Sequence, residues 1–142
     1  MFATLRRLLG RKKITMVHPT LGELEFDQDD GVWGTVQTEP IYHGGIPGCD
    51  SGPDSDRVNE VINRLVNMDS YWVACSEDLL YIASTSASFP QTNNPKDIFR
   101  VTALSLYPNY WEVCFETHTQ YKWLYVGMQF EGEELVSNTI SR

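Results

Sequence analysis

The chain has 142 residues, of which 42% are hydrophobic and 21% are charged, and its formal net charge at pH 7 is −8. This length fits one domain, and the composition excludes disordered, collagen-like and coiled-coil chains. All 19 acidic but only 6 of the 11 basic side chains lie in residues 14–142, so this part has a net charge of −13. Such a charge argues against nucleic-acid binding, because phosphate contacts need a basic surface.

Residues 1–13 form a basic leader that we treat separately from a single acidic domain over residues 14–142. The leader has five basic side chains, no acid and apolar residues at helical spacing. It fits a helix on a membrane surface, or a short helix docked on the domain by its apolar side, and we favour the second. The chain has no apolar run long enough for a transmembrane span. The leader also lacks an apolar run of the length that a secretory signal needs.

Two predicted strands follow, over residues 14–18 and 21–27, and in the second one apolar and acidic side chains alternate. An Asp30-Gly31 turn then leads into a third alternating run over residues 32–36. Two alternating runs around Asp-Gly predict a β-hairpin.

Residues 38–56 are rich in glycine and proline and are predicted to be mainly loop, with room for one short strand near Tyr42 and Ile46. A long loop without structure of its own is often functional, so this segment is a candidate contact surface.

Two helices are predicted next. Asp54 and the residues after it provide an N-cap and an acidic first turn, and apolar residues then recur at helical spacing from Val58 to Val66. A second helix restarts at Asp69 and continues to about Ala83, which predicts an αα corner. Residues 84–97 are polar and are predicted to form a loop.

The last third of the chain is strand-like, with runs over residues 98–107, 110–118 and 122–130 and a short edge strand expected near Leu135 and Val136. Strands, then helices, then strands, without βαβ alternation, predict an α+β fold. We expect an antiparallel β-sheet with the two central helices packed on one face.

The sequence contains no established catalytic motif and indicates no cofactor. The three cysteines, Cys49, Cys75 and Cys114, include no Cys-x-x-Cys pair and indicate a reducing compartment, which we take to be the cytoplasm. A metal site or a Cys/His enzyme would have to use His43, Cys49 and nearby acids, but paired ligands at zinc-site spacing are missing. We therefore predict a protein that is not an enzyme, and keep a small metal-dependent or Cys/His enzyme as the alternative.

Acidic residues crowd the tip of the first hairpin at Asp27, Asp29 and Asp30. Turn chemistry and solubility explain most such clusters, and the residues lack the spacing of an EF-hand loop. The other interpretation is an acidic patch that attracts and selects a cationic partner.

One strand face combines aromatic and acidic residues. If the apolar residues of the run 122–130 face the core, Trp123 and Tyr125 point to the opposite face, and Glu112 and Glu116 lie beside them on the neighbouring strand. Tryptophan and tyrosine are favoured at the centres of protein interfaces. This face is either a binding surface or is covered by the leader or a loop.

The segment Leu21-Gly22-Glu23-Leu24-Glu25-Phe26-Asp27, with Trp33 and the late Trp123, resembles a family of uncharacterised bacterial domains over about residues 18–140. Some members of this family are similar to immunity proteins of bacterial polymorphic toxin systems. The resemblance implies a protein that binds and blocks a cognate toxin, although the basic leader departs from the pattern.

These observations predict an immunity-type inhibitor whose partner is a cationic toxin domain. The predicted partner-binding residues are Asp27, Asp29, Asp30, Trp123, Tyr125, Glu112 and Glu116. The alternatives are the enzyme described above and a membrane-peripheral adaptor that docks through the leader, although we expect no membrane partner.

Overall fold

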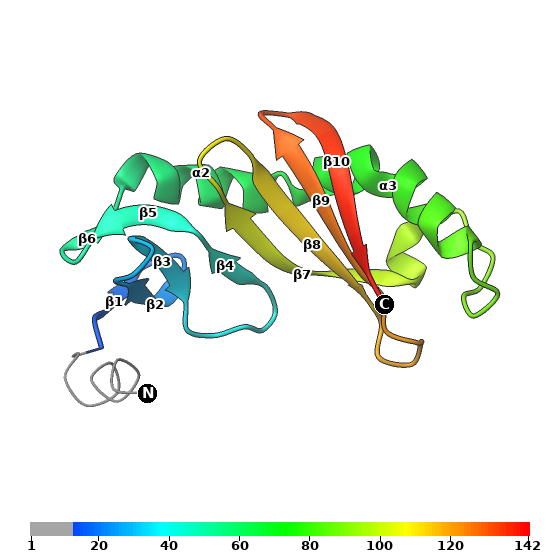
Figure 1. Ribbon diagram of the computed structural model, residues 1–142, viewed down its shortest axis with the longest axis horizontal. Helices are drawn as coiled ribbons and strands as arrows, with labels where there is room; N and C mark the ends of the chain where they lie inside the picture. Colours follow the sequence, from blue (N-terminus) through cyan, green and yellow to red (C-terminus); the bar gives the residue numbers. More distant parts are fainter. Residues whose placement is uncertain (1–12) are drawn as a thin grey trace.

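The computed structural model describes residues 13–142, so the helix expected in the leader lies outside the described residues (Figure 1). In chain order the strands and helices are β1 (Thr15–His18), β2 (Gly22–Asp27), β3 (Val32–Thr35), β4 (Tyr42–Gly44), β5 (Ile46–Cys49), β6 (Gly52–Pro53), α2 (Ser55–Val66), α3 (Met68–Ser84), the short 3-10 helix η1 (Pro95–Asp97), β7 (Phe99–Leu106), β8 (Trp111–Thr117), β9 (Tyr125–Glu131) and β10 (Glu134–Ser141). None of the helices in this part of the chain has both the length and the apolar character needed to cross a membrane.

The fold is α+β, as predicted, but the strands form two sheets where the sequence led us to expect one. The first sheet has the order β1-β2-β3-β5-β6 and the second has the order β10-β9-β8-β7-β4. Neighbouring strands are antiparallel except for β4 and β7, which are parallel. Figure 1 shows the first sheet at one end of the molecule and the second sheet in front of the helices.

The predicted first hairpin is confirmed as β2 and β3. Leu24 is fully buried, and Phe26 lies opposite Trp33 with their ring centroids 5.2 Å apart. The turn is closed by the Asp27 side chain, whose Oδ1 accepts a hydrogen bond from the Asp29 backbone N–H at 2.9 Å. Gly31 ends the turn at φ +67°, a backbone conformation that glycine adopts without steric cost.

Residues 38–56, predicted to be mainly loop, contain the three short strands β4, β5 and β6. β4 belongs to the second sheet and β5 to the first, with only Gly45 between them. Gly45 has φ +70°, and a Cβ at this position would collide with the carbonyl oxygen of Leu106. The chain therefore passes from one sheet to the other at a residue that must be glycine.

The two predicted helices are confirmed as α2 and α3, which are separated by Asn67 alone. Asp54 occupies the N-cap position of α2, but it contributes its backbone carbonyl rather than a side-chain hydrogen bond. In Figure 1 the helices follow one another along the length of the molecule, behind the second sheet.

Aromatic side chains pack α3 against the second sheet. Tyr71 meets Trp111 and Phe130 edge-on, and Trp72 meets Phe115 in the same way, with centroid distances from 4.7 to 5.4 Å. One cluster of buried apolar side chains includes these contacts and continues into both sheets and both helices. The side chains of Cys75, Leu79, Ile82 and Ala83 in α3 are buried as well.

An arginine ties the two helices to the turn between β9 and β10. The Arg64 guanidinium lies 4.3 Å from the centroid of the Trp111 ring and donates a hydrogen bond to the Tyr71 hydroxyl at 2.8 Å. It also forms an ion pair with Glu133, which accepts a hydrogen bond from the same hydroxyl at 3.0 Å. We call Arg64, Tyr71, Trp111 and Glu133 the Arg64 cluster.

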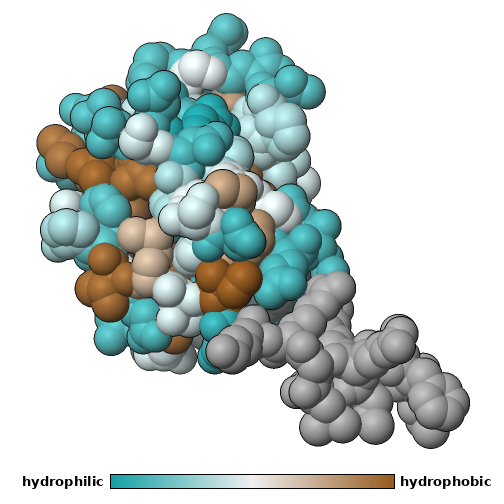
Figure 2. Space-filling model, turned by 90° about the vertical axis from the view of Figure 1, so that its left-hand side faces the viewer, coloured by the Kyte–Doolittle hydropathy of each residue, from teal (hydrophilic) through white to brown (hydrophobic). Residues whose placement is uncertain are grey.

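Two strands at the end of the chain differ from the prediction. β9 begins at Tyr125 rather than near Lys122, and β10 runs for 8 residues where a short edge strand was expected. Its side chains are mostly exposed, and no further strand of the described residues pairs with its outer edge. Figure 2 shows the end of the molecule that carries the first sheet, with hydrophobic residues in separate patches among hydrophilic ones.

Candidate functional site

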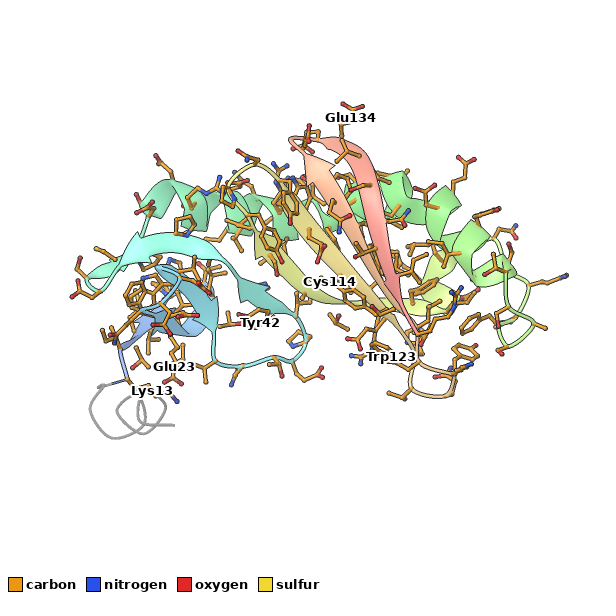
Figure 3. All side chains as sticks on the ribbon, viewed as in Figure 1. Lys13, Glu23, Tyr42, Cys114, Trp123 and Glu134 are labelled. Atoms are coloured by element: carbon orange, nitrogen blue, oxygen red, sulfur yellow. The ribbon has the colours of Figure 1, made fainter. Side chains whose placement is uncertain are left out.

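The candidate site lies on the outer face of the second sheet, by which we mean the side opposite α3. In β8 and β9 the residues that alternate with the core side chains point to this side. Cross-strand pairs on the outer face are Glu112 with Gln129, Cys114 with Gly127 and Glu116 with Tyr125. Figure 3 shows Cys114 at the middle of this sheet, between Tyr42 of β4 and Trp123 near the start of β9.

Trp123 is the most exposed aromatic residue of the outer face, with 50% of its surface accessible. Its indole Nε1–H donates a hydrogen bond of 2.6 Å to the Glu116 carboxylate. Its ring lies beside the Tyr125 ring, with a centroid distance of 6.4 Å and a tilt of 23°. An indole held by a carboxylate presents an apolar ring and a negative charge next to each other.

Beneath these residues lies a buried carboxylate with no ion pair to a basic side chain of residues 13–142. Glu112 is 9% exposed, and its Oε1 accepts hydrogen bonds from the Tyr125 hydroxyl at 3.0 Å and from the Cys114 thiol at 3.1 Å. Gln129 donates a hydrogen bond to the other oxygen. A buried carboxylate is stable only when its oxygens are satisfied, and here three neutral donors satisfy them.

The space for this carboxylate comes from Gly127. A Cβ at position 127 would lie 2.9 Å from the carboxyl group of Glu112 and 2.9 Å from the Thr139 hydroxyl. Any side chain at this position would displace one of these groups.

Burial keeps the donors of this network protonated. Burial raises the pKa of the Cys114 thiol to about 12, and it also raises the pKa of the Tyr125 hydroxyl. At neutral pH both groups are therefore neutral donors, and Cys114 lacks the thiolate that a cysteine nucleophile requires. This part of the network therefore consists of two neutral donors and the carboxylate that accepts their hydrogen bonds.

An open pocket of about 410 Å³ lies between this face and the segment that precedes β4. Its lining residues are Thr38, Glu39, Pro40, Tyr42, Arg100, Thr102, Ala103, Cys114, Glu116 and Tyr125. Arg100 is directly opposite Glu116 in the β7–β8 register, but its guanidinium lies 3.9 Å from the carboxylate of Glu39. The pocket thus contains two carboxylates and one guanidinium.

Tyr42 forms the wall of the pocket where the two sheets meet. A Cβ at Gly34 would lie 2.5 Å from the Tyr42 hydroxyl oxygen, and a Cβ at Gly44 would lie 2.5 Å from a carbon of its ring, so the side chain rests on both glycines. Gly34 belongs to β3 of the first sheet and Gly44 to β4 of the second. This contact fixes the position of the wall relative to the sheet.

The structure brings together four of the predicted site residues, Trp123, Tyr125, Glu112 and Glu116. The three aspartates of the hairpin tip lie elsewhere, in the turn between β2 and β3 of the first sheet. The Asp27 carboxylate accepts hydrogen bonds from the backbone N–H groups of both other aspartates and so stabilises the turn. The tip and the outer face are therefore two separate groups of acids.

The residues of the enzyme alternative belong to strands of different sheets. His43 lies in β4 of the second sheet, whereas Cys49 ends β5 of the first sheet and is hydrogen-bonded to Ser51. His118 is bonded to the backbone carbonyl of Lys96 at 2.8 Å. Within residues 13–142, no group of three or more histidine, cysteine or acidic side chains is arranged to hold a metal ion.

Sequence reasoning missed Glu39, Tyr42 and Arg100 as members of the pocket. Glu39 and Tyr42 are in the glycine- and proline-rich segment, which the sequence identified only as a candidate contact surface. They reach the site because β4 pairs in parallel with β7, a long-range contact for which the local pattern contains no signal.

Comparisons with known proteins found no match for this chain. No protein-family model matches the chain, and neither the curated proteins nor the solved structures contain a match. The function has to be argued from the chemistry of the outer face.

Proposed function

We propose that the protein is a cytoplasmic inhibitor of the immunity type, which acts without catalysis by binding a cognate cationic protein such as a bacterial toxin domain. The observation that carries this proposal is the half-exposed Trp123, hydrogen-bonded to Glu116 and next to Tyr125 at an open pocket. Aromatic anchors at the centre of a patch provide much of the energy of protein interfaces.

The charge of the chain supports a basic partner. Residues 14–142 have a net charge of −13, and a field of this size accelerates the encounter with an oppositely charged protein. The neutral Cys114 and Tyr125 agree with a surface that binds rather than reacts. The acids of the hairpin tip contribute to the long-range field in this proposal, and the contact itself is assigned to the outer face.

The proposal is tested by co-expressing the chain with the product of the neighbouring gene, under conditions where that product stops bacterial growth. We expect the chain to restore growth and to co-purify with the product. Trp123→Ala should weaken the complex about 30-fold, the effect of losing an interface hot spot of about 2 kcal/mol. Binding is measured by titration calorimetry on the purified proteins.

The matched control is Tyr81→Ala. Tyr81 is an exposed aromatic residue of α3, with 71% of its surface accessible, and α3 lies on the other side of the second sheet. This variant should bind as the unmodified chain does. Failure of the chain to restore growth and to form a complex would contradict the proposal, and equal losses in the two variants would remove the outer face from it.

A further inference from the structure

Glu116 has a charge that no basic side chain of the described residues compensates. Arg100 occupies the position directly across from it on β7, yet the guanidinium is turned to Glu39 at 3.9 Å. The hydrogen-bond partner of the Glu116 carboxylate is the neutral indole of Trp123. One carboxylate oxygen is engaged in this way, and Glu116 is one of the residues that line the pocket.

The balance of charge in and under the pocket is negative. Glu39 and Arg100 offset one another, which leaves Glu116 in the lining. The Glu112 carboxylate lies directly behind Cys114 and Tyr125, and its three donors are neutral groups. A cation that enters the pocket is therefore attracted by two carboxylates, whereas an anion would meet both of them.

The geometry around Trp123 discriminates between cations. The Nε1–H bond places one oxygen of the Glu116 carboxylate at the edge of the indole ring. A planar cation stacked on a ring face would therefore use the second carboxylate oxygen as its acceptor. A guanidinium is planar, stacks on aromatic faces and donates hydrogen bonds within its own plane. An ammonium is a strongly hydrated point charge that can satisfy only part of this arrangement.

We propose that the outer face receives an arginine side chain of the partner at the edge of the pocket, with its guanidinium stacked on Trp123, which lies beside the pocket lining, and hydrogen-bonded to Glu116, which belongs to that lining. This inference rests on the proposed function, because the arginine belongs to the protein that the outer face binds. It adds the chemical group that is recognised and the two residues that recognise it.

The test is a titration of the full chain with N-acetyl-arginine amide, which has the end groups of an arginine within a polypeptide. The readout is the indole N–H signal of Trp123 in ¹H–¹⁵N spectra, assigned with Trp123→Phe. Trp33 and Trp111 donate their indole hydrogens to backbone carbonyls at 2.9 and 2.7 Å and serve as internal references. We expect a saturable shift of the Trp123 signal at millimolar concentrations, while the two references stay in place.

Two matched compounds test the contribution of the guanidinium charge, and free arginine tests whether the ligand is a partner side chain or a small molecule. N-acetyl-citrulline amide has the shape of the arginine probe without the charge, and it should bind at least about 5-fold more weakly, the loss expected for one partly exposed charge contact. N-acetyl-lysine amide should also bind more weakly than the arginine probe. If free arginine binds much more tightly than the blocked amide, the pocket is a site for a small molecule, and the assignment to a partner side chain is wrong.

Two charge variants provide opposite expectations. Glu116→Gln keeps an acceptor for the indole and removes the charge, so it should weaken binding of the arginine probe by about 3- to 5-fold. Arg100→Gln removes the positive charge across the strand, so it should strengthen binding by about 2- to 3-fold. Weaker binding of the probe in Arg100→Gln would show that its positive charge is not what the pocket attracts and would overturn the inference, as would a citrulline amide that binds as well as the arginine probe.

The two proposals fail in different ways. If the chain restores growth in the co-expression test and Glu116→Gln restores it equally well, the immunity function stands and the arginine inference is wrong. If the arginine probe binds as described but no complex forms with the neighbouring gene product, the pocket stands and the proposed function is wrong.

Discussion

Gly127 makes the buried carboxylate of the outer face possible, because no larger residue leaves room for Glu112. In an ordinary strand, alanine is more stable than glycine by about 0.5–1 kcal/mol. Here the added Cβ would lie 2.9 Å from the Glu112 carboxyl group and from the Thr139 hydroxyl. We expect Gly127→Ala to lower the free energy of unfolding by about 1–3 kcal/mol, as overpacking does. Urea unfolding followed by circular dichroism measures this change.

A double variant identifies the cause of this loss. Thr139 is exposed, and in Thr139→Ala one of the two obstacles at position 127 is gone. Gly127→Ala combined with Thr139→Ala should therefore be less destabilised than the sum of the single variants. A stable Gly127→Ala protein would show that the Glu112 carboxylate has another place to go.

His43 makes the stability of the fold depend on pH. Burial lowers the pKa of His43 from its ordinary value of 6.5, and its buried Nδ1 has no hydrogen-bond partner among the residues that the structure describes. At pH values well above 6.5 the imidazole is neutral in the folded and unfolded states, so it does not make the stability depend on pH. As the pH falls through 6.5 the unfolded chain takes up the proton first, and the folded state loses stability.

The comparison of the unmodified chain with His43→Gln isolates this contribution. Carboxylates and the other histidines titrate in both proteins, so the difference in slope belongs to His43. Between pH 7.5 and 5.5 the free energy of unfolding should fall more steeply in the unmodified chain than in the variant. Equal slopes would show that the folded chain accepts the proton at position 43 without cost.

At the level of single residues, the sequence predicted the outer face better than the rest of the site. Strict alternation in the segments that became β8 and β9 was enough to place Glu112, Glu116 and Tyr125 on one side, because the side-chain period of a strand is two. Trp123 precedes β9 and joins this side through its bond to Glu116. The burial of Glu112 was not predictable, because it depends on Gly127 and Gln129 of another strand.

Among the elements, the connection of the helices to the second sheet depends on the Arg64 cluster. The Arg64 side chain is 13% exposed and joins α2 to Tyr71 of α3, to the Trp111 ring and to Glu133. Arg64→Ala removes the contact with the Trp111 ring and the hydrogen bonds to Tyr71 and Glu133. Alanine favours a helix at least as much as arginine does, so helix propensity does not contribute to the loss. We expect the free energy of unfolding to fall by about 2–3 kcal/mol.

Arg57 is the matched control in the same helix. It makes an ion pair of 2.7 Å with Glu60, but its side chain is more exposed than that of Arg64. Arg57→Ala should therefore cost less than about 1 kcal/mol in the same urea experiment. Similar losses in Arg57→Ala and Arg64→Ala would mean that the cluster adds nothing to an ordinary surface ion pair.

Elements with a strong local pattern were predictable, and elements defined by distant partners were not. The β2–β3 hairpin and both helices follow from alternation, an Asp-Gly turn and helical spacing. β4 and β6 have 3 and 2 residues, too few for a periodic pattern. They exist because β7 and β5 offer hydrogen-bonding edges, and the length of β10 likewise depends on its pairing with β9.

For the whole molecule, the decisive feature is the passage of the chain between the two sheets at Gly45. This residue has φ +70°, and a Cβ would meet the backbone of Leu106. The passage sets β4 beside β7 and thereby places Tyr42 and Glu39 at the pocket. We expect Gly45→Ala to be destabilised by about 1–2 kcal/mol through the left-handed backbone, and by a further amount of about 1–3 kcal/mol through the collision.

Gly132→Ala separates these two contributions. Gly132 has φ +58°, close to that of Gly45, but no atom lies within 4 Å of the position of its Cβ. This variant should show the backbone cost alone, and its Trp123 indole signal should be unchanged. Gly45→Ala should unfold at lower urea than Gly132→Ala and should also shift the Trp123 signal, because the pocket wall moves with β4. Equal stability of the two variants would mean that the backbone of β7 yields at Leu106, and that the junction between the sheets tolerates a side chain.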